Sequence, residues 1–308
     1  MLLGLRIDVC TYEGLRTGVP ALLRLLDRHR VCASFFVTLG PDCSGRAVFQ
    51  LLRPGFLAKM RRTSAARTYG WRTAVSGTLL PARQMGRQAD MIRRIAAAGH
   101  EVALHGYAHR TWQDRINRMP EASIRAFVSA AVAQYTEILG HAPAAFGAPG
   151  WQCTPASLRL NDAFRFAYAS DTRGSAPFYP SVDGHRLQTV QLPTTCPTLD
   201  EALGVDGIDE QRFVSVIRSA SQKTEWPVLV LHAEMEGGRY QGAAEVLCAW
   251  MAAEGITPMP LRAMIERLRT SGARIADAEV VGVPIPGRAG LVSAPRGLEP
   301  LSWQRGAA

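Results

Sequence analysis

The feature that most constrains the fold is a regular alternation of short apolar stretches with amphipathic ones. The chain opens with "LLGLRI" at residues 2–7, continues with "VPALLRLLDRH", and reaches a second apolar stretch, "VCASFFVTLG", that ends at Gly40. The middle segment has apolar residues at helical spacing, and Pro20 suits a first helical turn. This order predicts two neighbouring parallel strands joined by a right-handed helical crossover.

The same alternation continues along most of the chain. Further helices are predicted in "QADMIRRIAAAGH", "PEASIRAFVSAAVAQYTEILG", "DEQRFVSVIRSASQK", "GAAEVLCAWMAAEG" and "LRAMIERLRT", and further strands in "EVALH", "AAFGAPG", "FAYAS", "RLQTVQL" and "PVLVLHA". So many strand–helix units favour an α/β barrel over a small open sheet. We expect the barrel to occupy residues 1–270. Residues 271–308 are rich in Gly, Pro, Ala and Arg, and we expect an irregular tail there.

Residues 43–89 interrupt this rhythm after the second strand. The segment contains nine Lys and Arg residues and no Asp or Glu, a charge equal to the +9 of the whole chain. A solvated basic insertion is the simplest interpretation, but large apolar residues such as Phe56 are interleaved with the charges. That mixture favours a surface for anionic lipid or phosphate. The candidate contacts to substrate or membrane are Arg61, Arg62, Trp71, Arg72 and, outside the segment, Trp151.

Composition and termini limit the classes of protein. The six cysteines are scattered without a CxxC pair, which favours reduced thiols and the cytoplasm. The first residues lack the pattern of a secretion signal, and no run of about 18 apolar residues occurs. Membrane contact is therefore expected from the surface. The net charge favours an anionic partner, but no recognisable nucleic-acid-binding motif is present, so we do not expect nucleic acid.

The stretch "EVALHGYAHRTW" carries the strongest chemical signal. His105 and His109 are four residues apart and follow an apolar strand. On a helical turn this spacing brings both imidazoles to one face, within reach of one metal ion. The spacing is common by chance, but its place after a strand strengthens it, because barrel active sites gather where the strands end.

Other predicted strands also end in polar side chains. Asp8 follows "LRI" and could be a metal ligand or a general base. His232 ends "PVLVLH" and could be a general acid or a polar group at the barrel rim. Asp171 and Arg173 follow "FAYAS"; they could pair with each other, orient a catalytic group or bind an anionic ligand.

The order of these motifs resembles the polysaccharide deacetylase (NodB-homology) family of metal-dependent de-N-acylases, whose fold is a distorted, partly open (β/α) barrel. Stretches such as "GLRIDV", "SDTRG..PF" and "HAE.EG..Y" extend the resemblance over about residues 4–292, including the basic insertion. They are similar to the branch that removes formate from a formamido-sugar on undecaprenyl phosphate. The resemblance implies an aminoarabinose donor for lipid A modification as product, and a peripheral place on the cytoplasmic face of the inner membrane.

The resemblance also implies roles for the candidate residues. They are a base, two metal ligands, an acid and a supporting pair, namely Asp8, His105 with His109, His232, and Asp171 with Arg173. Two positions depart from the family pattern. Cys10 replaces the metal-binding aspartate, and Gly147 stands where many deacetylases have an arginine.

Cys10 leaves three alternatives open. With His105 and His109 it could form a three-ligand site with one open position, and a thiolate would favour zinc over manganese. Alternatively, Asp8 turns to the metal and Glu234 supplies the base. In the third alternative the barrel is inactive and binds a lipid or a sugar. A deacetylase acting on another N-acyl sugar is a further competing function.

Overall fold

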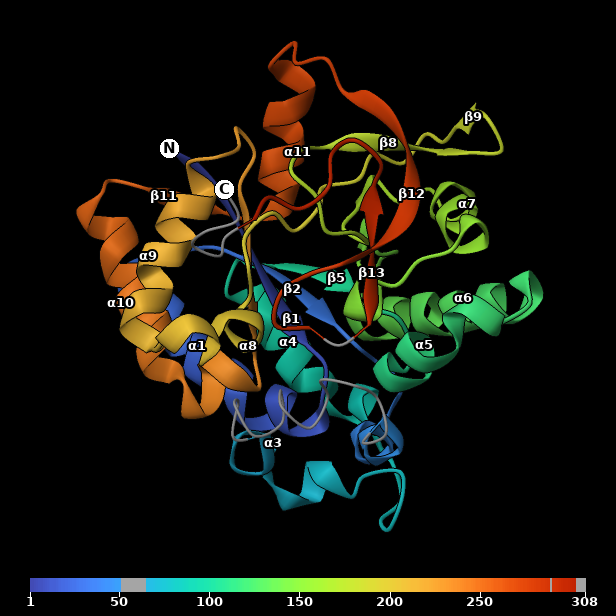
Figure 1. Ribbon diagram of the computed structural model, residues 1–308. Helices are drawn as coiled ribbons and strands as arrows, with labels where there is room; N and C mark the ends of the chain where they lie inside the picture. The colour runs from blue at the N-terminus through green and yellow to red at the C-terminus, as the bar shows by residue number, and fades with distance from the viewer. Residues whose placement is uncertain (51–64, 289, 303–308) are drawn as a thin grey trace.

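The computed structural model describes residues 1–50, 65–288 and 290–302. Its centre is a curved parallel sheet in the order β10-β1-β2-β5-β6-β7, with β11 beside the first residues of β1 (Figure 1). These strands are β1 (Leu2–Val9), β2 (Ser34–Val37), β5 (Glu101–Leu104), β6 (Ala145–Phe146), β7 (Tyr168–Ala169), β10 (Val228–His232) and β11 (Thr257–Met259). The predicted α/β barrel class is confirmed.

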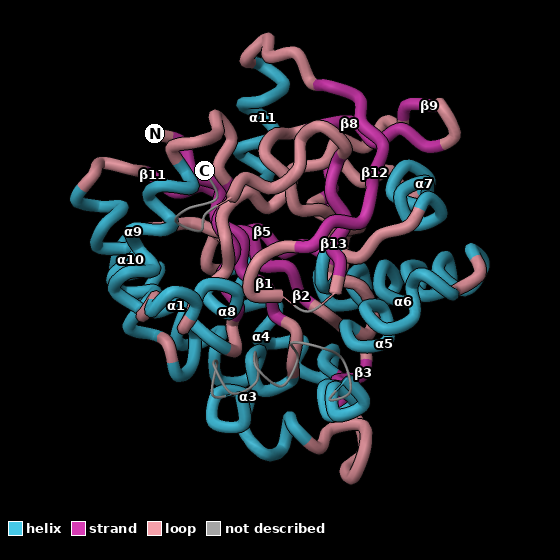
Figure 2. The backbone as a smooth tube through the Cα atoms, in the orientation of Figure 1, coloured by secondary structure: helices cyan, strands magenta, loops and turns pink. Residues whose placement is uncertain are grey.

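Helices follow the strands as the alternation predicts, and they cover the outside of the sheet (Figures 1 and 2). They are α1 (Val19–His29), α4 (Ala89–Ala97), α5 (His109–Arg115), α6 (Glu121–Leu139), α7 (Pro155–Ala163), α8 (Leu199–Ala202), α9 (Glu210–Ser221), α10 (Gln241–Ala253) and α11 (Leu261–Thr270). Gly140 ends α6 with a φ of 78°, a conformation that glycine adopts without the penalty of a Cβ.

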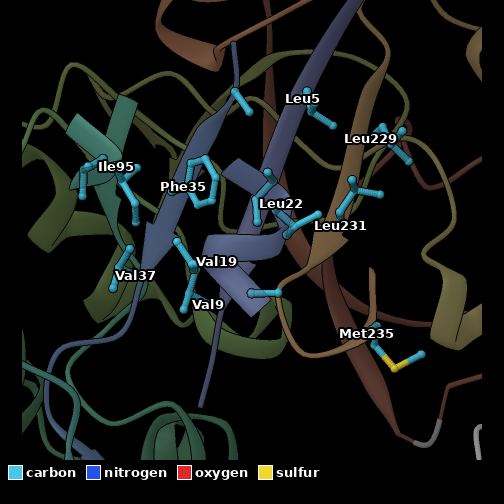
Figure 3. Close-up of a cluster of buried hydrophobic side chains, with 14 of the residues drawn as sticks. Leu5, Val9, Val19, Leu22, Phe35, Val37, Ile95, Leu229, Leu231 and Met235 are labelled. Carbon is cyan, nitrogen blue, oxygen red and sulfur yellow. The ribbon is translucent and has the colours of Figure 1, made fainter. Parts of the chain in front are cut away.

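The two faces of β1 have different surroundings. One face packs against the helices and belongs to the main core, through Leu3, Leu5, Ile7 and Val9. Figure 3 shows Leu5 beside Leu229 of β10, and Val9 beside Val19 of α1. Successive side chains of a strand alternate between faces, so Arg6 and Asp8 point to the other face, inside the barrel.

Helix α11 fills the barrel interior near the start of β1. A Cβ at Gly4 would lie 2.7 Å from Leu261 Cδ2 and 3.0 Å from Met264 Cε, so a larger residue would require these side chains of α11 to move. Met264 and Leu268 of the same helix join a second apolar cluster with Phe36. At the start of the strands the buried polar groups Ser34 and Glu101 accept hydrogen bonds from the first backbone N–H groups of α11, so the polar groups that remain for chemistry lie where the strands finish.

A second, four-stranded sheet has the order β13-β12-β8-β9. It consists of β8 (Phe178–Val182), β9 (His185–Arg186), β12 (Ala276–Pro284) and β13 (Leu291–Pro295). The expectation of an irregular tail is wrong for β12 and β13, because β12 finds a parallel partner in the distant β8. The strand predicted in "RLQTVQL" is also mostly wrong: it is reduced to β9 and isolated bridges from Gln191 to Ala169 and Phe178.

The basic segment is closed at its base by a short antiparallel pair, β3 (Pro41–Asp42) with β4 (Arg83–Gln84). Between them lie the 3-10 helix η2 (Ser44–Gln50) and α3 (Ala65–Ala74), while Arg61 and Arg62 lie outside the described residues. Trp71 is 66% exposed and Leu79 is 83% exposed. The helices of the described ranges are all too short or too polar to cross a bilayer.

The turns that follow β1 and β10, η1 (Gly14–Gly18) and η7 (Met235–Arg239), pack directly on each other. A Cβ at Gly18 would lie 2.0 Å from the backbone oxygen of Ala233. We expect Gly18→Ala to lower the free energy of unfolding by about 1–3 kcal/mol, because backbone must move to remove the clash. Chemical denaturation would measure this change.

Gly242→Ala is the matched control for this substitution. Gly242 lies in α10, where a new Cβ would meet only the end of the Glu210 side chain, at 3.2 Å. Alanine is favoured over glycine in a helix by up to about 1 kcal/mol, so the control should be neutral or stabilising. Equal effects of the two substitutions would contradict the close packing of the two turns.

Candidate metal and catalytic site

Strand register brings distant parts of the sequence together at one end of the barrel. Asp8 of β1 pairs in register with His232 of β10 on one side and with Phe36 of β2 on the other. His105 directly follows β5, and its backbone N–H donates to Val37 O at the end of β2. The predicted acid and both predicted histidine motifs therefore meet where parallel strands end, as expected for a barrel active site.

Arg6 anchors this group, although the sequence reasoning missed it. Its Nε and Nη2 donate to the two carboxylate oxygens of Asp8, at 2.5 and 2.9 Å, and its Nη1 donates to Ser170 O at 2.6 Å. The guanidinium lies 4.2 Å from the centre of the Phe36 ring, and Arg6 is fully buried. The signal was available in "LRIDV": a charged residue two positions before Asp8 must share its face of the strand.

The ion pair keeps Asp8 ionised. Burial raises the pKa of Asp8, but the charge of Arg6, aided by His105 and His232, outweighs burial and lowers the pKa to about 2. The folded-state pKa thus lies below the ordinary 3.8. Asp8 therefore stabilises the fold above about pH 4, and this contribution is lost as the pH falls towards 2.

The imidazole of His105 is oriented for a metal. Its Nδ1 lies 2.9 Å from Gly147 O, a contact that requires a proton on Nδ1 and leaves the Nε2 lone pair free. Nε2 is buried and has no hydrogen-bond partner among the described residues, with Asp8 Oδ2 3.5 Å away. A buried, unpartnered ring nitrogen whose other nitrogen binds a carbonyl is the expected state of a metal ligand without its ion.

His109 and Cys10 complete a cluster of three ligand atoms. These atoms and the one of His105 all lie within 4.8 Å of one another. Burial lowers the pKa of His105 to about 4 and that of His109 well below its ordinary 6.5, so both imidazoles are neutral at pH 7. Burial, with the charge of Glu234, raises the pKa of Cys10 well above 9. A thiolate at Cys10 therefore needs a cation beside it. The donor set, two neutral imidazoles and one sulfur, fits zinc.

Glu234 holds the loop that carries Cys10. Its Oε1 accepts hydrogen bonds from the backbone N–H of Cys10 at 2.8 Å, the backbone N–H of Thr11 at 2.7 Å and the Thr11 hydroxyl at 3.0 Å. A Cβ at Gly14 would lie 2.2 Å from the same oxygen. These contacts give Glu234 a structural role in placing Cys10, in place of the role of base that the sequence left open.

His232 lies between a carboxylate and an aromatic ring. Its backbone N–H donates to Glu236 Oε2 at 2.8 Å, and its buried Nδ1 has no hydrogen-bond partner in the described ranges. The Trp151 ring stands edge-on to it, with centroids 6.4 Å apart. Trp151 is 2% exposed, so its predicted contact with a membrane surface is wrong. Its ring forms a wall of the site. Nε1 of Trp151 donates to the Thr194 hydroxyl at 2.9 Å, which fixes the ring in this position.

Asp171 does not pair with Arg173. Asp171 accepts hydrogen bonds from the Ala148 backbone at 2.8 Å, from Asn161 at 2.7 Å and from Gln191 at 2.9 Å. It therefore fixes the loop after β6, whose Gly147 carbonyl orients His105. None of the hydrogen bonds found among the described residues joins Asp171 to His232.

In the part of the chain that the structure describes, Arg173 reaches the site through Trp151. Its Nη1 donates to both carboxylate oxygens of Glu201 at 2.7 Å, and its guanidinium lies 5.0 Å from the Trp151 ring centre. Arg288 lies 4.7 Å from the same ring centre and 3.6 Å from Glu201. The two guanidinium groups and the carboxylate hold Trp151 in place, so the contacts give Arg173 a supporting position behind the wall.

Gly147 explains one departure from the family pattern. A Cβ at this position would lie 2.6 Å from Phe36 and 3.0 Å from Arg6 Nη2. A larger side chain does not fit while the Arg6 guanidinium occupies this space. The cation beside Asp8 thus comes from β1 itself, and a glycine at position 147 makes room for it.

The strand ends of this parallel barrel bring together a His-His-Cys cluster, an ionised carboxylate and a histidine. This arrangement is typical of a metal-dependent hydrolase. The model of the polysaccharide deacetylase family matches residues 4–168, more than half of the chain. The chain therefore belongs to the polysaccharide deacetylase family.

Within this family the chain is similar to two proteins named probable 4-deoxy-4-formamido-L-arabinose-phosphoundecaprenol deformylase ArnD. The one from Shewanella sediminis is 37% identical over 94% of this chain and 93% of its own length. The one from Wigglesworthia glossinidia brevipalpis is 29% identical over 91% and 97%. The crystal structure of a putative polysaccharide deacetylase from Mycobacterium smegmatis has the same fold, with a TM-score of 0.61, 19% identity and coverage of 92% and 94%.

Loss of the Arg6 guanidinium should destabilise the folded protein. We expect Arg6→Met to lower the free energy of unfolding at pH 7 by about 3–5 kcal/mol, because the Asp8 charge stays buried without its partner. Chemical denaturation of the metal-free protein would measure it. The double variant Arg6→Met/Asp8→Asn should recover much of this loss, since no buried charge then remains unpaired. Additive effects of the two substitutions would contradict the coupling.

Proposed function

We propose that this chain is a metal-dependent deformylase. Its proposed substrate is 4-deoxy-4-formamido-L-arabinose carried on undecaprenyl phosphate, and its products are formate and the aminoarabinose donor for lipid A modification. The observation that carries the proposal is the buried, unpartnered Nε2 of His105, which lies beside Cys10 and His109 and 3.5 Å from an ionised Asp8. Similarity to the deformylases over nearly the whole chain supports the choice of substrate.

Cys10, His105 and His109 would hold the metal, and the sulfur ligand favours zinc. Bound there, zinc would supply Lewis-acid chemistry for the formyl oxygen and for the attacking water. The chain contributes ligands that are already oriented: Gly147 O fixes His105, and Glu234 fixes the loop of Cys10.

Asp8 accepts the proton of the attacking water. Its pKa of about 2 means that it is in the accepting form at every physiological pH. The same low pKa makes Asp8 a weak base. It can accept the proton of the water only if a bound metal lowers the pKa of that water. Arg6 holds both carboxylate oxygens and so fixes the direction of the proton transfer.

His232 donates a proton to the departing amine. It lies beside Asp8 in the strand register, so acid and base flank one position at the barrel mouth. The edge of Trp151 limits the orientations of the imidazole, and Glu236 holds the backbone N–H of His232. The proposed base and the proposed acid therefore come from two different strands, β1 and β10.

The basic segment supports a peripheral place at the anionic cytoplasmic face of the inner membrane. Trp71 and Leu79 are largely exposed, and the Arg72 guanidinium lies 5.5 Å from the Trp71 ring centre. Exposed aromatic and aliphatic side chains among arginines and without acidic neighbours in sequence suit the boundary of an anionic bilayer.

Formate release from the lipid-linked formamido-sugar tests the proposal. We expect release that a chelator abolishes and that added zinc restores. Absence of release with zinc and with manganese would overturn the proposed reaction and favour an inactive, ligand-binding barrel. Release of acetate from an N-acetyl sugar, but no release of formate, would instead favour another deacetylase.

Coordination by Cys10 should appear in the pH dependence of metal affinity. Because burial keeps the thiol protonated, binding must release about one proton, so zinc affinity should rise about tenfold per pH unit near neutrality. In Cys10→Asp this slope should disappear, since a carboxylate is already ionised. Competition titrations with a chromophoric chelator would measure both slopes.

Cobalt gives an independent readout of the same contact. The cobalt-loaded protein should show a sulfur-to-metal charge-transfer absorption that Cys10→Asp lacks. Cys248→Ser is the matched control, because Cys248 is buried in α10 away from the cluster and should leave the absorption unchanged. An unchanged absorption in Cys10→Asp would overturn the role of Cys10 as a ligand.

His232→Asn should separate chemistry from metal binding. We expect the rate of formate release to fall by about 10²–10⁴-fold, because the departing amine loses its proton donor, while zinc content stays near that of the unchanged protein. Single-turnover kinetics and metal analysis of the same preparation would measure this. His109→Asn is the contrasting control and should lose metal and activity together. Equal metal loss in both variants would remove the role of acid from His232.

A further inference from the structure

The basic segment leaves the sheet between the two strands that lead to the proposed metal ligands. In the sheet, β2 lies between β1, which leads to Cys10, and β5, which leads to His105 and His109 (Figure 1). The chain passes from the end of β2 into β3 and then into the basic segment. Residues 38–42, which we call the insertion base, therefore run between the two loops that carry the ligands.

On the side of Cys10, the insertion base is joined to the ligand loop by Asp42. This side chain is buried, and its Oδ2 accepts a hydrogen bond from the backbone N–H of Tyr12 at 2.9 Å. Because Glu234 accepts from the backbone N–H groups of Cys10 and Thr11, three successive N–H groups of this loop donate to carboxyl oxygens. The loop is therefore held from two directions, by the turn after β10 and by the insertion base.

Asp42 is held in turn by the basic segment. Its Oδ1 accepts from the backbone N–H of Ser44 at 3.0 Å and from the Ser44 hydroxyl at 2.6 Å. The Ser76 hydroxyl donates to the backbone oxygen of Asp42 at 2.7 Å. From β4, at the other end of the segment, the Arg83 guanidinium lies 4.2 Å from the centre of the Tyr12 ring. Both ends of the basic segment thus contact the loop after β1.

On its other side, the insertion base is bonded to the segment from His105 to His109. The Thr38 hydroxyl donates to His105 O at 3.1 Å, and the backbone N–H of Gly40 donates to Tyr107 O at 2.6 Å. A Cβ at Gly40 would lie 2.5 Å from the same oxygen of Tyr107. Any side chain at position 40 would therefore push against the backbone that joins the two histidines.

We propose that the insertion base is a positioning element of the metal site, in which Asp42 sets the place of the Cys10 loop and Gly40 that of the histidine loop. This inference rests on the proposed function and gives the basic segment a second role beside its surface towards the membrane. The three donor atoms come from two loops, so their separations depend on what spaces those loops. Contacts behind the ligands of a metal typically change its affinity by about 10–100-fold when they are removed.

Two substitutions test the two sides of the insertion base separately. Asp42→Asn keeps the shape of the side chain but replaces one acceptor oxygen by a donor, so the bonds from Tyr12 and Ser44 cannot all remain. Gly40→Ala sets a methyl group against Tyr107 O. We expect each substitution to lower zinc affinity at pH 7 about tenfold or more. Competition with a chromophoric chelator would measure the affinities.

Cobalt distinguishes the two sides. At saturating cobalt, Asp42→Asn should weaken or shift the sulfur-to-metal absorption, because the loop of Cys10 has lost a contact. Gly40→Ala should keep this absorption, because the loop that it displaces carries no sulfur. Ser34→Ala is the matched control: it removes a buried hydrogen-bonding side chain at the opposite end of β2 and should change neither the affinity nor the absorption.

Unchanged zinc affinity in Asp42→Asn and Gly40→Ala would overturn the inference. An equal loss of affinity in Ser34→Ala would also overturn it, because a general loss of stability would then explain the effect. A third result against it would be an unchanged absorption in Asp42→Asn, which would remove the link from Asp42 to Cys10.

Hydrogen exchange of the unchanged protein tests the inference without a variant. The coupling between metal and insertion base is reciprocal, so zinc should slow exchange of the Ser44 N–H, which donates to Asp42, about tenfold. The same exchange rate with and without zinc would overturn the inference. Zinc binding that depends on Asp42, without formate release, would keep the inference and overturn the proposed reaction. A protein that binds neither zinc nor cobalt would overturn both.

Discussion

The site depends on the buried ion pair between Arg6 and Asp8. Two charges inside a barrel are tolerated only when their hydrogen bonds are satisfied, and this pair meets that condition through two mutual bonds, the Ser170 carbonyl and the Phe36 ring. One guanidinium thus connects three neighbouring parts of the barrel end. It keeps the carboxylate ionised and in one orientation, which a proton acceptor beside a metal requires.

The position of Arg6 and Asp8 inside the barrel follows from the alternation of side chains along β1. Odd-numbered residues of β1 join the apolar core beneath the helices, and even-numbered residues point into the barrel. Helix α11 fills the interior at the start of the strand, against Gly4. Polar groups are then possible only further along the same face, at Arg6 and Asp8. A shift of the strand by one residue would bury both charges against the helices, so the register is strongly determined.

The sequence predicted the barrel, the helices α1, α4, α6, α9, α10 and α11, and the residues that meet at the strand ends, because apolar periodicity and strand-end position are local signals. It did not predict α3, α7 or α8. It did not predict contacts that depend on distant partners. Arg6 lies beside Gly147 only through the order of the sheet. Glu234 reaches Cys10 only because the turns after β1 and β10 pack together. The strand β12 was missed for the same reason, since its partner β8 is about a hundred residues away in the chain.

The surroundings of Cys10 suit its proposed role in place of a metal-binding aspartate, because they favour a ligand that is neutral without metal. A carboxylate at position 10 would lie close to Asp8 and Glu234, whose charges already raise the pKa of the thiol. In the metal-free protein a neutral thiol avoids a third buried negative charge at this point, and the fold tolerates the empty site at lower cost. The proposed site would convert the thiol to an anion only when a cation binds, so the new negative charge would be neutralised by that cation. In the proposed site, Cys10 would therefore link stability of the metal-free barrel to selectivity for a thiophilic metal, through its burial and the two carboxylates that flank it.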